Sequence, residues 1–138
     1  MAAHTKFKVE ILTPEGEVYN DEVEMISTRT TVGEIGILAN HAPVLGMLEP
    51  TELRVYVTDS EVLRFAQSEG YMQVGGNHAM LLVQDLQKPD ELDTGTLRER
   101  LSEAERELEQ AGDDTERRRV ALREQKRWQA FLKVAEGS

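Results

Sequence analysis

Apolar and polar residues alternate with a period of two over the first two thirds of the chain, which is typical of β-strands with one buried face. Phe7, Val9 and Ile11, for example, alternate with charged residues. The run 79–83 is apolar throughout, which predicts a strand covered on both faces. Turn-forming residues separate the runs, at 13–16, 59–60, 68–70 and 75–77. Short strands at this spacing predict a sandwich or a barrel.

The period changes after Pro89, where apolar residues recur every three or four positions, as on one face of a helix. These residues are Leu97, Leu101, Ala104, Leu108 and Ala111. Thr96 with Glu99 fits a capping box at the helix start, and Gly112 fits its end. We therefore expect a helix over about 96–111.

Asp113 and Glu116 repeat the capping pattern before a second helix, expected over about 114–135. Because the connection is so short, the two helices are expected to form an antiparallel hairpin. The predicted organisation is a β-domain over 1–88 and a helical hairpin over 89–138. The hairpin has few apolar residues to bury, which makes it a candidate for a moving part.

The composition narrows the function. The chain has 138 residues, with 26 Asp and Glu against 16 Lys and Arg, for a net charge of −10. This charge argues against binding to nucleic acid. No cysteine is present, so disulfides and thiolate chemistry are excluded. The longest uncharged stretches, 35–48 and 71–84, have 14 residues each, too short for direct membrane insertion.

Positive charge gathers in the second predicted helix. Residues 113–138 carry 7 basic and 5 acidic groups, whereas 1–112 carry 9 and 21. The basic residues of interest are Arg117, Arg118, Arg119, Arg123, Lys126 and Arg127. They are interpreted either as a solvated face that pairs with the acidic first helix, or as a docking segment for an acidic partner.

Special residues are densest over 33–43 (Gly-Glu-Ile-Gly-Ile-Leu-Ala-Asn-His-Ala-Pro). Glu34 and His41 could form an acid–base pair, and a small hydrolase is the weakest hypothesis. However, the three histidines, at positions 4, 41 and 78, lack the spacing of metal ligands, and no serine lies in a nucleophile motif. We expect no catalytic residue and no metal site. An ordered recognition loop is favoured, with sharp turns at Gly33 and Gly36.

This segment closely resembles the corresponding motif of the epsilon subunit of bacterial F-type ATP synthases. The opening residues 7–16 and the segment 69–77 resemble two further parts of that family, and the likeness covers essentially the whole chain. The resemblance implies a ten-stranded flattened β-sandwich followed by two helices. It also implies a non-catalytic subunit at the cytoplasmic face of a bacterial cell membrane, peripheral to it, rather than at a thylakoid.

The resemblance further implies partners and site residues. The partners would be the gamma subunit, the membrane rotor ring and, when the helices extend to inhibit ATP hydrolysis, the catalytic beta and alpha subunits. Glu34 and His41 would contact the rotor ring together, at one end of the sandwich. The supporting loop residues would be Gly33, Gly36, Asn40 and Pro43. The inhibitory segment would be the basic residues of the second helix.

Some family members bind ATP through an Ile/Leu-Asp-x-x-Arg-Ala motif. Here Leu92 and Asp93 are present, but Thr96 stands at the arginine position. We therefore expect no cofactor and weak or no binding of ATP as a regulatory ligand. Asp93, Arg119 and Arg123 are the residues that could still contact it. An ATP-sensing protein whose hairpin folds onto the sandwich remains the alternative function.

Overall fold

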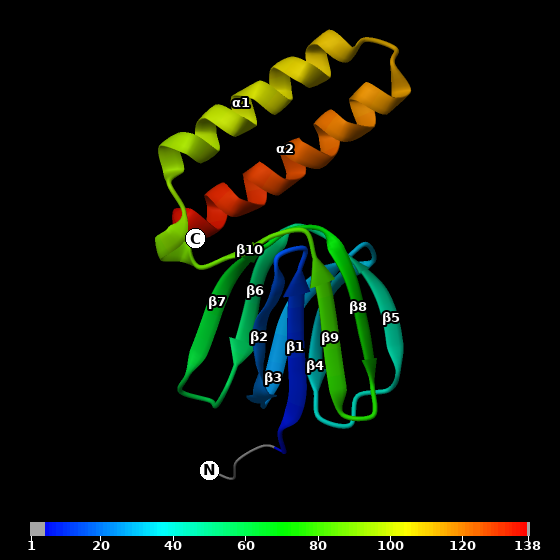
Figure 1. The fold of residues 1–138 in the computed structure, drawn as a ribbon, viewed down its shortest axis with the longest axis vertical. Helices are drawn as coiled ribbons and strands as arrows, with labels where there is room; N and C mark the ends of the chain where they lie inside the picture. The colour runs from blue at the N-terminus through cyan, green and yellow to red at the C-terminus, as the bar shows by residue number, and fades with distance from the viewer. Residues whose placement is uncertain (1–4, 138) are drawn as a thin grey trace.

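The computed structural model describes residues 5–137 and shows a β-domain below a two-helix hairpin (Figure 1). The strands are β1 (Phe7–Thr13), β2 (Gly16–Val23), β3 (Met25–Thr30), β4 (Gly33–Leu38), β5 (Val44–Leu48), β6 (Thr51–Tyr56), β7 (Val62–Gln67), β8 (Gly70–Gly75), β9 (His78–Val83) and β10 (Leu86–Gln87). The helices are η1 (Pro89–Glu91), α1 (Thr94–Ala111) and α2 (Thr115–Ala135). The predicted ten-stranded sandwich followed by a helical hairpin is confirmed.

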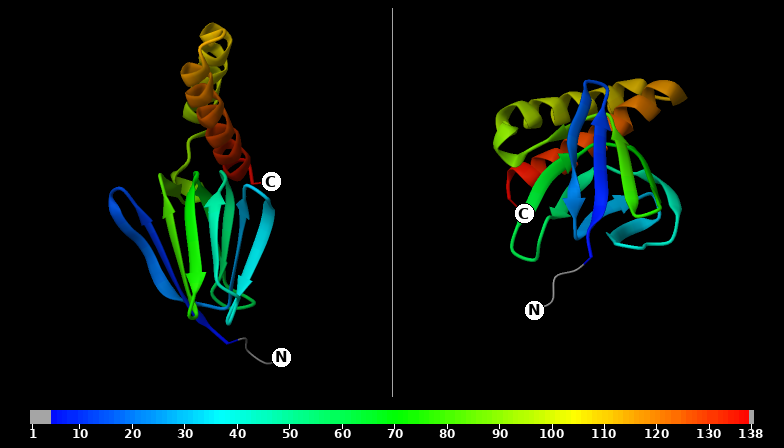
Figure 2. Two further views of the ribbon diagram at one scale, coloured as in Figure 1. Left: turned by 90° about the vertical axis from the view of Figure 1, so that its right-hand side faces the viewer. Right: turned by 60° about the horizontal axis from the view of Figure 1, so that its bottom comes forward.

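The strands form two layers (Figure 2). One contains β10, β7, β6 and β3, with β4 paired to β3, and the other contains β5, β8, β9, β1 and β2. Between β3 and β5, the pairing joins Thr30 to Leu48. Neighbouring strands are antiparallel except for β1 and β9, which run parallel. The sandwich is thus one sheet folded over on itself.

Alternate residues of each layer fill the space between the layers. Val9 and Ile11 of β1 are fully buried, as are Ile26 of β3 and Leu81 of β9. This burial confirms the period-two pattern that predicted the strands.

One strand differs from the prediction. The apolar run 79–83 suggested a strand covered on both faces, but only Ala79, Leu81 and Val83 are buried. The outward Leu82 is 47% exposed. β9 therefore has an apolar outer face that no described part of the chain covers.

Both helices begin one residue after an aspartate, and both predicted caps are wrong. Asp93 precedes α1 and accepts a hydrogen bond from the Gly95 N–H at 3.1 Å, while the Thr96 hydroxyl donates to it. Asp114, not Asp113, precedes α2 and accepts from the Arg117 N–H at 3.1 Å. A carboxylate directly before the first turn is well placed to accept a hydrogen bond from one of the free N–H groups of that turn.

The two helices meet along a shallow seam. The expected apolar face of α1 is confirmed, since Ala104 and Ala111 are buried and Leu101 is half-buried. Across the seam, Ala121 of α2 is buried as well. Toward the sandwich the seam is deeper, because Leu97 of α1 is almost fully buried in the same cluster as Trp128 and Phe131 of α2. The packing between the helices is therefore shallow near the hairpin tip and more extensive near the sandwich.

Glu52 holds β6 to β7. Its carboxylate accepts two hydrogen bonds from Arg64, at 2.8 and 3.0 Å, and one from Arg54 at 2.7 Å. The hydrogen bonds from Arg64, with those from Arg54, outweigh the effect of burial and lower the pKa of Glu52 to about 2. The ionised carboxylate is thus favoured in the folded protein.

Replacing Glu52 with Gln should lower the free energy of unfolding by about 2 kcal/mol at pH 7, after allowance for solvent screening. The pKa of Glu52 is depressed on folding, so its contribution is complete above pH 4.5 and is lost as the pH falls toward 2. Urea unfolding of parent and variant should therefore converge in acid. Glu22→Gln, at an exposed position, is the matched control. Equal stability of the Glu52 and Glu22 variants at pH 7 would contradict the prediction.

Candidate interaction surfaces

The segment 33–43 is largely a strand, not a loop. Residues Gly33–Leu38 form β4, which pairs with β3 so that Glu34 lies opposite Arg29. His41 follows the other end of β4, and a strand advances by about 3.3 Å per residue. Glu34 and His41 consequently lie at opposite ends of the sandwich. The expectation that they share one end is wrong, and they cannot form an acid–base pair.

Glu34 lies at the end of the sandwich nearest the hairpin. It lines a hollow of about 570 Å³ together with Ala130 and Lys133 of α2. Its side chain is 78% exposed and lies 3.3 Å from the Arg29 guanidinium. Val32, at the tip of the adjoining turn, is 95% exposed. This end therefore presents an accessible carboxylate beside an accessible apolar side chain.

His41 lies at the far end, beside the turn between β8 and β9, which is at the bottom of Figure 1. The N–H of the preceding Asn40, which has a φ of 65°, donates to the Asn77 side chain at 2.5 Å. The Nδ1 atom of His41 lies 2.6 Å from the Ala42 carbonyl oxygen. Pro43 then leads into β5. Asn40 thus ties this loop to a neighbouring turn.

The two glycines have different roles. Gly33 has a φ of 128°, which favours glycine, and it permits the predicted sharp turn. Gly36 lies inside β4, so the turn predicted there is wrong. A Cβ atom at Gly36 would lie 2.9 Å from the Met25 Cε atom, which is the end of a flexible side chain and can shift, so the strand does not require glycine there.

The arginines of α2 do not form one solvated face. Arg119 pairs with Glu116 of its own helix at 2.6 Å, and Arg118 donates to the Gly112 carbonyl at 3.3 Å. Arg117 reaches across to α1, where its guanidinium lies 3.4 Å from the Glu107 carboxylate. Of these three arginines, the interpretation of a face paired with α1 therefore holds for Arg117.

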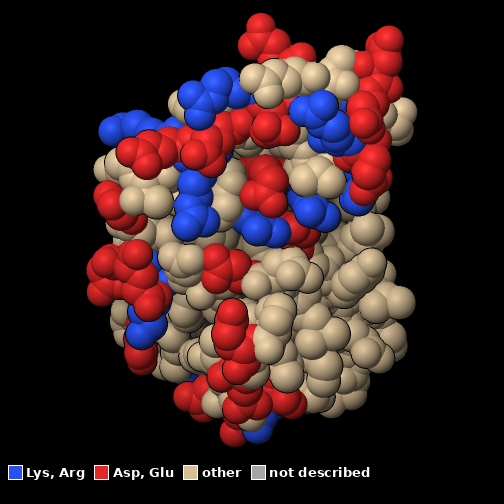
Figure 3. Space-filling model, turned by 45° about the horizontal axis from the view of Figure 1, so that its top comes forward, with Lys and Arg blue, Asp and Glu red and all other residues tan. Residues whose placement is uncertain are grey.

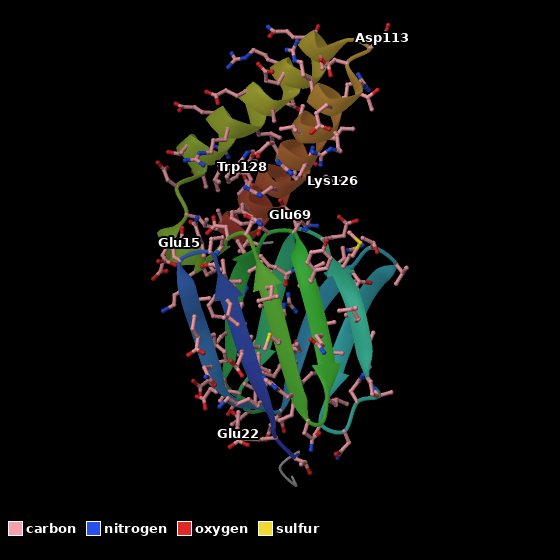
Figure 4. The ribbon with its side chains drawn as sticks, turned by 45° about the vertical axis from the view of Figure 1, so that its right-hand side comes forward. Glu15, Glu22, Glu69, Asp113, Lys126 and Trp128 are labelled. Carbon is pink, nitrogen blue, oxygen red and sulfur yellow. The ribbon has the colours of Figure 1, made fainter. Side chains whose placement is uncertain are left out.

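Arg123 and Arg127 instead meet the sandwich. The Arg127 guanidinium donates two hydrogen bonds to the Glu69 carboxylate, at 3.2 and 2.5 Å, and the Arg123 Nε atom lies 3.8 Å from it. Burial is the largest single effect and acts to lower the pKa of Arg127, but the hydrogen bond to Glu69 and the nearby acidic charges together outweigh it, so the pKa is raised. Figure 4 shows Glu69 at the top of the sandwich, directly below α2. Sequence reasoning missed Glu69, because nothing near it in the chain indicates a basic partner.

The residues considered for a nucleotide do not converge. Asp93 caps the start of α1, which lies beside the end of α2, as the 2.8 Å Arg98–Glu136 ion pair shows. Arg119 lies near the start of α2, roughly 24 Å away along a helix that rises 1.5 Å per residue. Asp93 and Arg119 therefore sit at opposite ends of the hairpin, and Arg123 is held near Glu69. No observation favours the ATP-sensing alternative.

The outer face of β5, β8 and β9 is an apolar surface without charge. None of these strands contains Asp, Glu, Lys or Arg, and Figure 3 shows a continuous uncharged area beside and below the hairpin. The exposed fractions are 75% for Leu45, 54% for Met47 and 55% for Tyr71. Strand register aligns Met47, Tyr71 and Leu82 across the three strands. We call these four residues the apolar face.

Sequence reasoning missed the apolar face, although a signal was present. The unbroken apolar run in β9 pointed to cover on its outer side, and within residues 5–137 nothing provides that cover. An exposed contiguous apolar patch on an otherwise acidic chain is typical of a protein–protein contact.

The described part of the chain contains neither a membrane-crossing helix nor a cluster of metal ligands. Neither α1 nor α2 has the length and hydropathy of a membrane-crossing helix. Over residues 5–137, no three His, Asp or Glu side chains gather as metal ligands would. The fold and its surfaces thus define a protein class: a small binding subunit with an exposed apolar face on a β-sandwich and a charged helical hairpin.

Comparison with known proteins gives the family. The family model described as "ATP synthase, Delta/Epsilon chain, beta-sandwich domain" matches residues 6–89, more than half of the chain. The ATP synthase epsilon chain of a Sulfurihydrogenibium species is 31% identical over 129 residues, covering 94% of this chain and 96% of that protein. The epsilon chain of Herpetosiphon aurantiacus is 34% identical, covering 84% and 86%. The chain belongs to the family of bacterial F-type ATP synthase epsilon chains, non-catalytic subunits of the central stalk.

Solved structures share the fold. A chain of the Euglena gracilis mitochondrial ATP synthase superposes with a TM-score of 0.80 at 18% identity, covering 97% of this chain and 84% of that one. A chain from the central stalk and c-ring structure of the Tetrahymena thermophila mitochondrial ATP synthase gives 0.65 at 18% identity, covering 97% and 99%.

Proposed function

We propose that this subunit links the catalytic head to the membrane rotor ring during proton-driven ATP synthesis and that its helices inhibit ATP hydrolysis. The apolar face is the observation that supports the first part. As a peripheral subunit, it acts at the cytoplasmic side of a bacterial cell membrane. It inserts no segment into the bilayer and binds no nucleic acid.

The gamma subunit of the stalk is the proposed partner of the apolar face. Burial of apolar surface stabilises a complex by about 25 cal/mol per Å², and the four side chains lie on adjoining strands of one rigid sheet. Without charges there, docking carries no cost of desolvating ions. Such a contact suits two subunits that must rotate together.

Replacing Leu45 and Tyr71 together with Ser should weaken binding to purified gamma subunit at least about tenfold, since buried anchor residues cost more than 1 kcal/mol each when truncated. The free energy of unfolding should change by only about 0.5 kcal/mol, because both side chains are exposed. Leu122→Ser, at a 40% exposed position of α2, is the control. Unchanged affinity of the double variant would place the gamma contact elsewhere.

Because Glu34 and His41 lie at opposite ends of the sandwich, we propose that the rotor ring contacts the end that holds Glu34. Its carboxylate is 78% exposed and Val32 projects beside it. His41 is half-buried, and its Nδ1 atom lies 2.6 Å from the Ala42 carbonyl oxygen. Of the two residues expected at the ring, we therefore retain Glu34, and His41 contacts another subunit or none.

Single substitutions separate the two ends. Glu34→Ala should lower the number of protons pumped per ATP by the assembled enzyme, whereas His41→Ala should leave it unchanged. Proton pumping and ATP hydrolysis measured on the same inverted vesicles give this ratio. The reverse result, with only His41→Ala lowering it, would place the opposite end on the ring.

The inhibitory part of the proposal rests on the hairpin. Its seam is shallow, and its second helix carries arginines and Lys126 that suit an acidic surface on the catalytic beta and alpha subunits. In the extended state these groups, with Trp128 and Phe131, would dock on the head. A difference of a few kcal/mol between the two states is enough for a switch.

Truncation after Lys88 should leave a sandwich that assembles, and ATP hydrolysis by the complex should rise. Changing Arg118, Arg119 and Lys126 together to Gln should raise hydrolysis less, and it leaves the contacts of Glu69 in place. Hydrolysis is measured with subunit content checked by gel. Normal assembly with unchanged hydrolysis by the truncated form would refute inhibition by the helices.

A further inference from the structure

The backbone around Glu69 is held by hydrogen bonds and close packing that do not involve the hairpin. Ser68 is fully buried, donates its N–H to the Asp85 carbonyl at 3.1 Å and accepts from the Asp85 N–H on its hydroxyl at 2.7 Å. The Gln84 N–H donates to the Glu69 carbonyl at 3.2 Å. At Gly70, a Cβ atom would lie 2.0 Å from the Leu82 carbonyl oxygen, so only glycine lets this turn approach β9 so closely.

The basic side of the contact is also ordered. Arg127 is 16% exposed, and its planar guanidinium meets the carboxylate through two parallel hydrogen bonds. It lies 5.6 Å from the ring of Trp128, with Arg100 of α1 at 4.8 Å from the same ring. A two-point contact of this kind is stronger than a single surface ion pair.

We propose that Glu69 is an internal acidic partner for Arg123 and Arg127, which holds the hairpin on the sandwich and competes with the catalytic head for these arginines. The competition rests on the proposed inhibitory function, whereas the holding contact does not. Glu69 and an acidic side chain of the catalytic head would compete because each offers a carboxylate, and a guanidinium can donate two hydrogen bonds to either one.

Extension of the hairpin then has a defined cost. Leaving Glu69 breaks the two hydrogen bonds of Arg127 and removes the nearby charge of Arg123. It also separates Phe131 and Val134, both almost fully buried, from Ala66 of β7. An acidic surface that binds the released arginines offsets the first of these losses. Glu69 therefore sets how strongly the head must bind before the hairpin extends.

The first test uses the isolated full-length chain, which has one tryptophan and no cysteine. Spin labels at Asp113→Cys, on the hairpin tip, and Glu15→Cys, on a turn of the sandwich, report the hairpin position through their distance distribution (Figure 4). Adding Glu69→Gln should raise the ratio of displaced to docked hairpin about tenfold, as expected for loss of hydrogen bonds to a charged group. Quenching of Trp128 fluorescence by acrylamide should rise with it.

Controls match each charge removed. Glu22→Gln, at the far end of the sandwich, removes the same charge as Glu69→Gln, and Lys126→Gln removes a charge next to Arg127 (Figure 4). Neither control should displace the hairpin, whereas Arg127→Gln should act like Glu69→Gln. The double variant that combines Glu69→Gln and Arg127→Gln should displace the hairpin little further than either single variant does. If Glu69→Gln and Arg127→Gln both match their controls, the proposal is wrong.

The second test uses the assembled enzyme. Enzyme that carries the Glu69→Gln subunit should hydrolyse ATP more slowly than enzyme with the parent subunit, because the hairpin extends more readily. A displaced hairpin in the isolated chain with unchanged hydrolysis would overturn the competition and retain the holding contact. If truncation after Lys88 also leaves hydrolysis unchanged, the inhibitory function itself fails, which separates the two claims.

Discussion

The contact between the C-terminal half of α2 and the edge of the sandwich determines where the whole hairpin lies. Its apolar part is small: Phe131 and Val134 pack near Ala66, and Trp128 lies beside them. Its polar part is the pair formed by Glu69 and Arg127. Since Leu97 of α1 packs in the same buried cluster as Trp128 and Phe131 of α2, α1 follows α2. At about 25 cal/mol per Å², so small a buried area leaves the docked state only modestly favoured.

The two functional surfaces differ in physical kind. The apolar face has no charged residue on its strands, so its binding free energy depends on buried area and changes little with salt. The arginines of α2 act through charge, which salt screens beyond about 8 Å at physiological ionic strength. A lasting contact and a reversible one are thus assigned to different parts of the chain. This division suits the proposed function, in which the hairpin moves while the rest of the subunit stays bound to the stalk.

Much of the fold could be predicted from local pattern, because strand alternation and helix periodicity act over a few residues. The errors arose where distant segments decide. Gly36 suggests a turn until pairing with β3 places it inside a strand, and Glu34 and His41 look adjacent until β4 separates them. No local pattern gives Glu69 a partner 58 residues away. The predicted caps were displaced from the true ones by a turn or less, since several neighbouring side chains suit the role.

The two surfaces also share a border. Met47, Tyr71 and Leu82 of the apolar face line the same hollow, of about 630 Å³, as Glu69, Arg123 and Arg127. On the proposed function, a gamma subunit seated on the apolar face reaches this hollow and removes water from around the ion pair. Attraction between opposite charges strengthens as the surrounding dielectric constant falls, although each charge also loses hydration. For a pair already hydrogen-bonded at two points and mostly buried, much of the hydration cost is met on folding of the chain itself. Under the proposed function, docking of gamma would therefore favour the folded hairpin, so that the lasting contact would bias the reversible one.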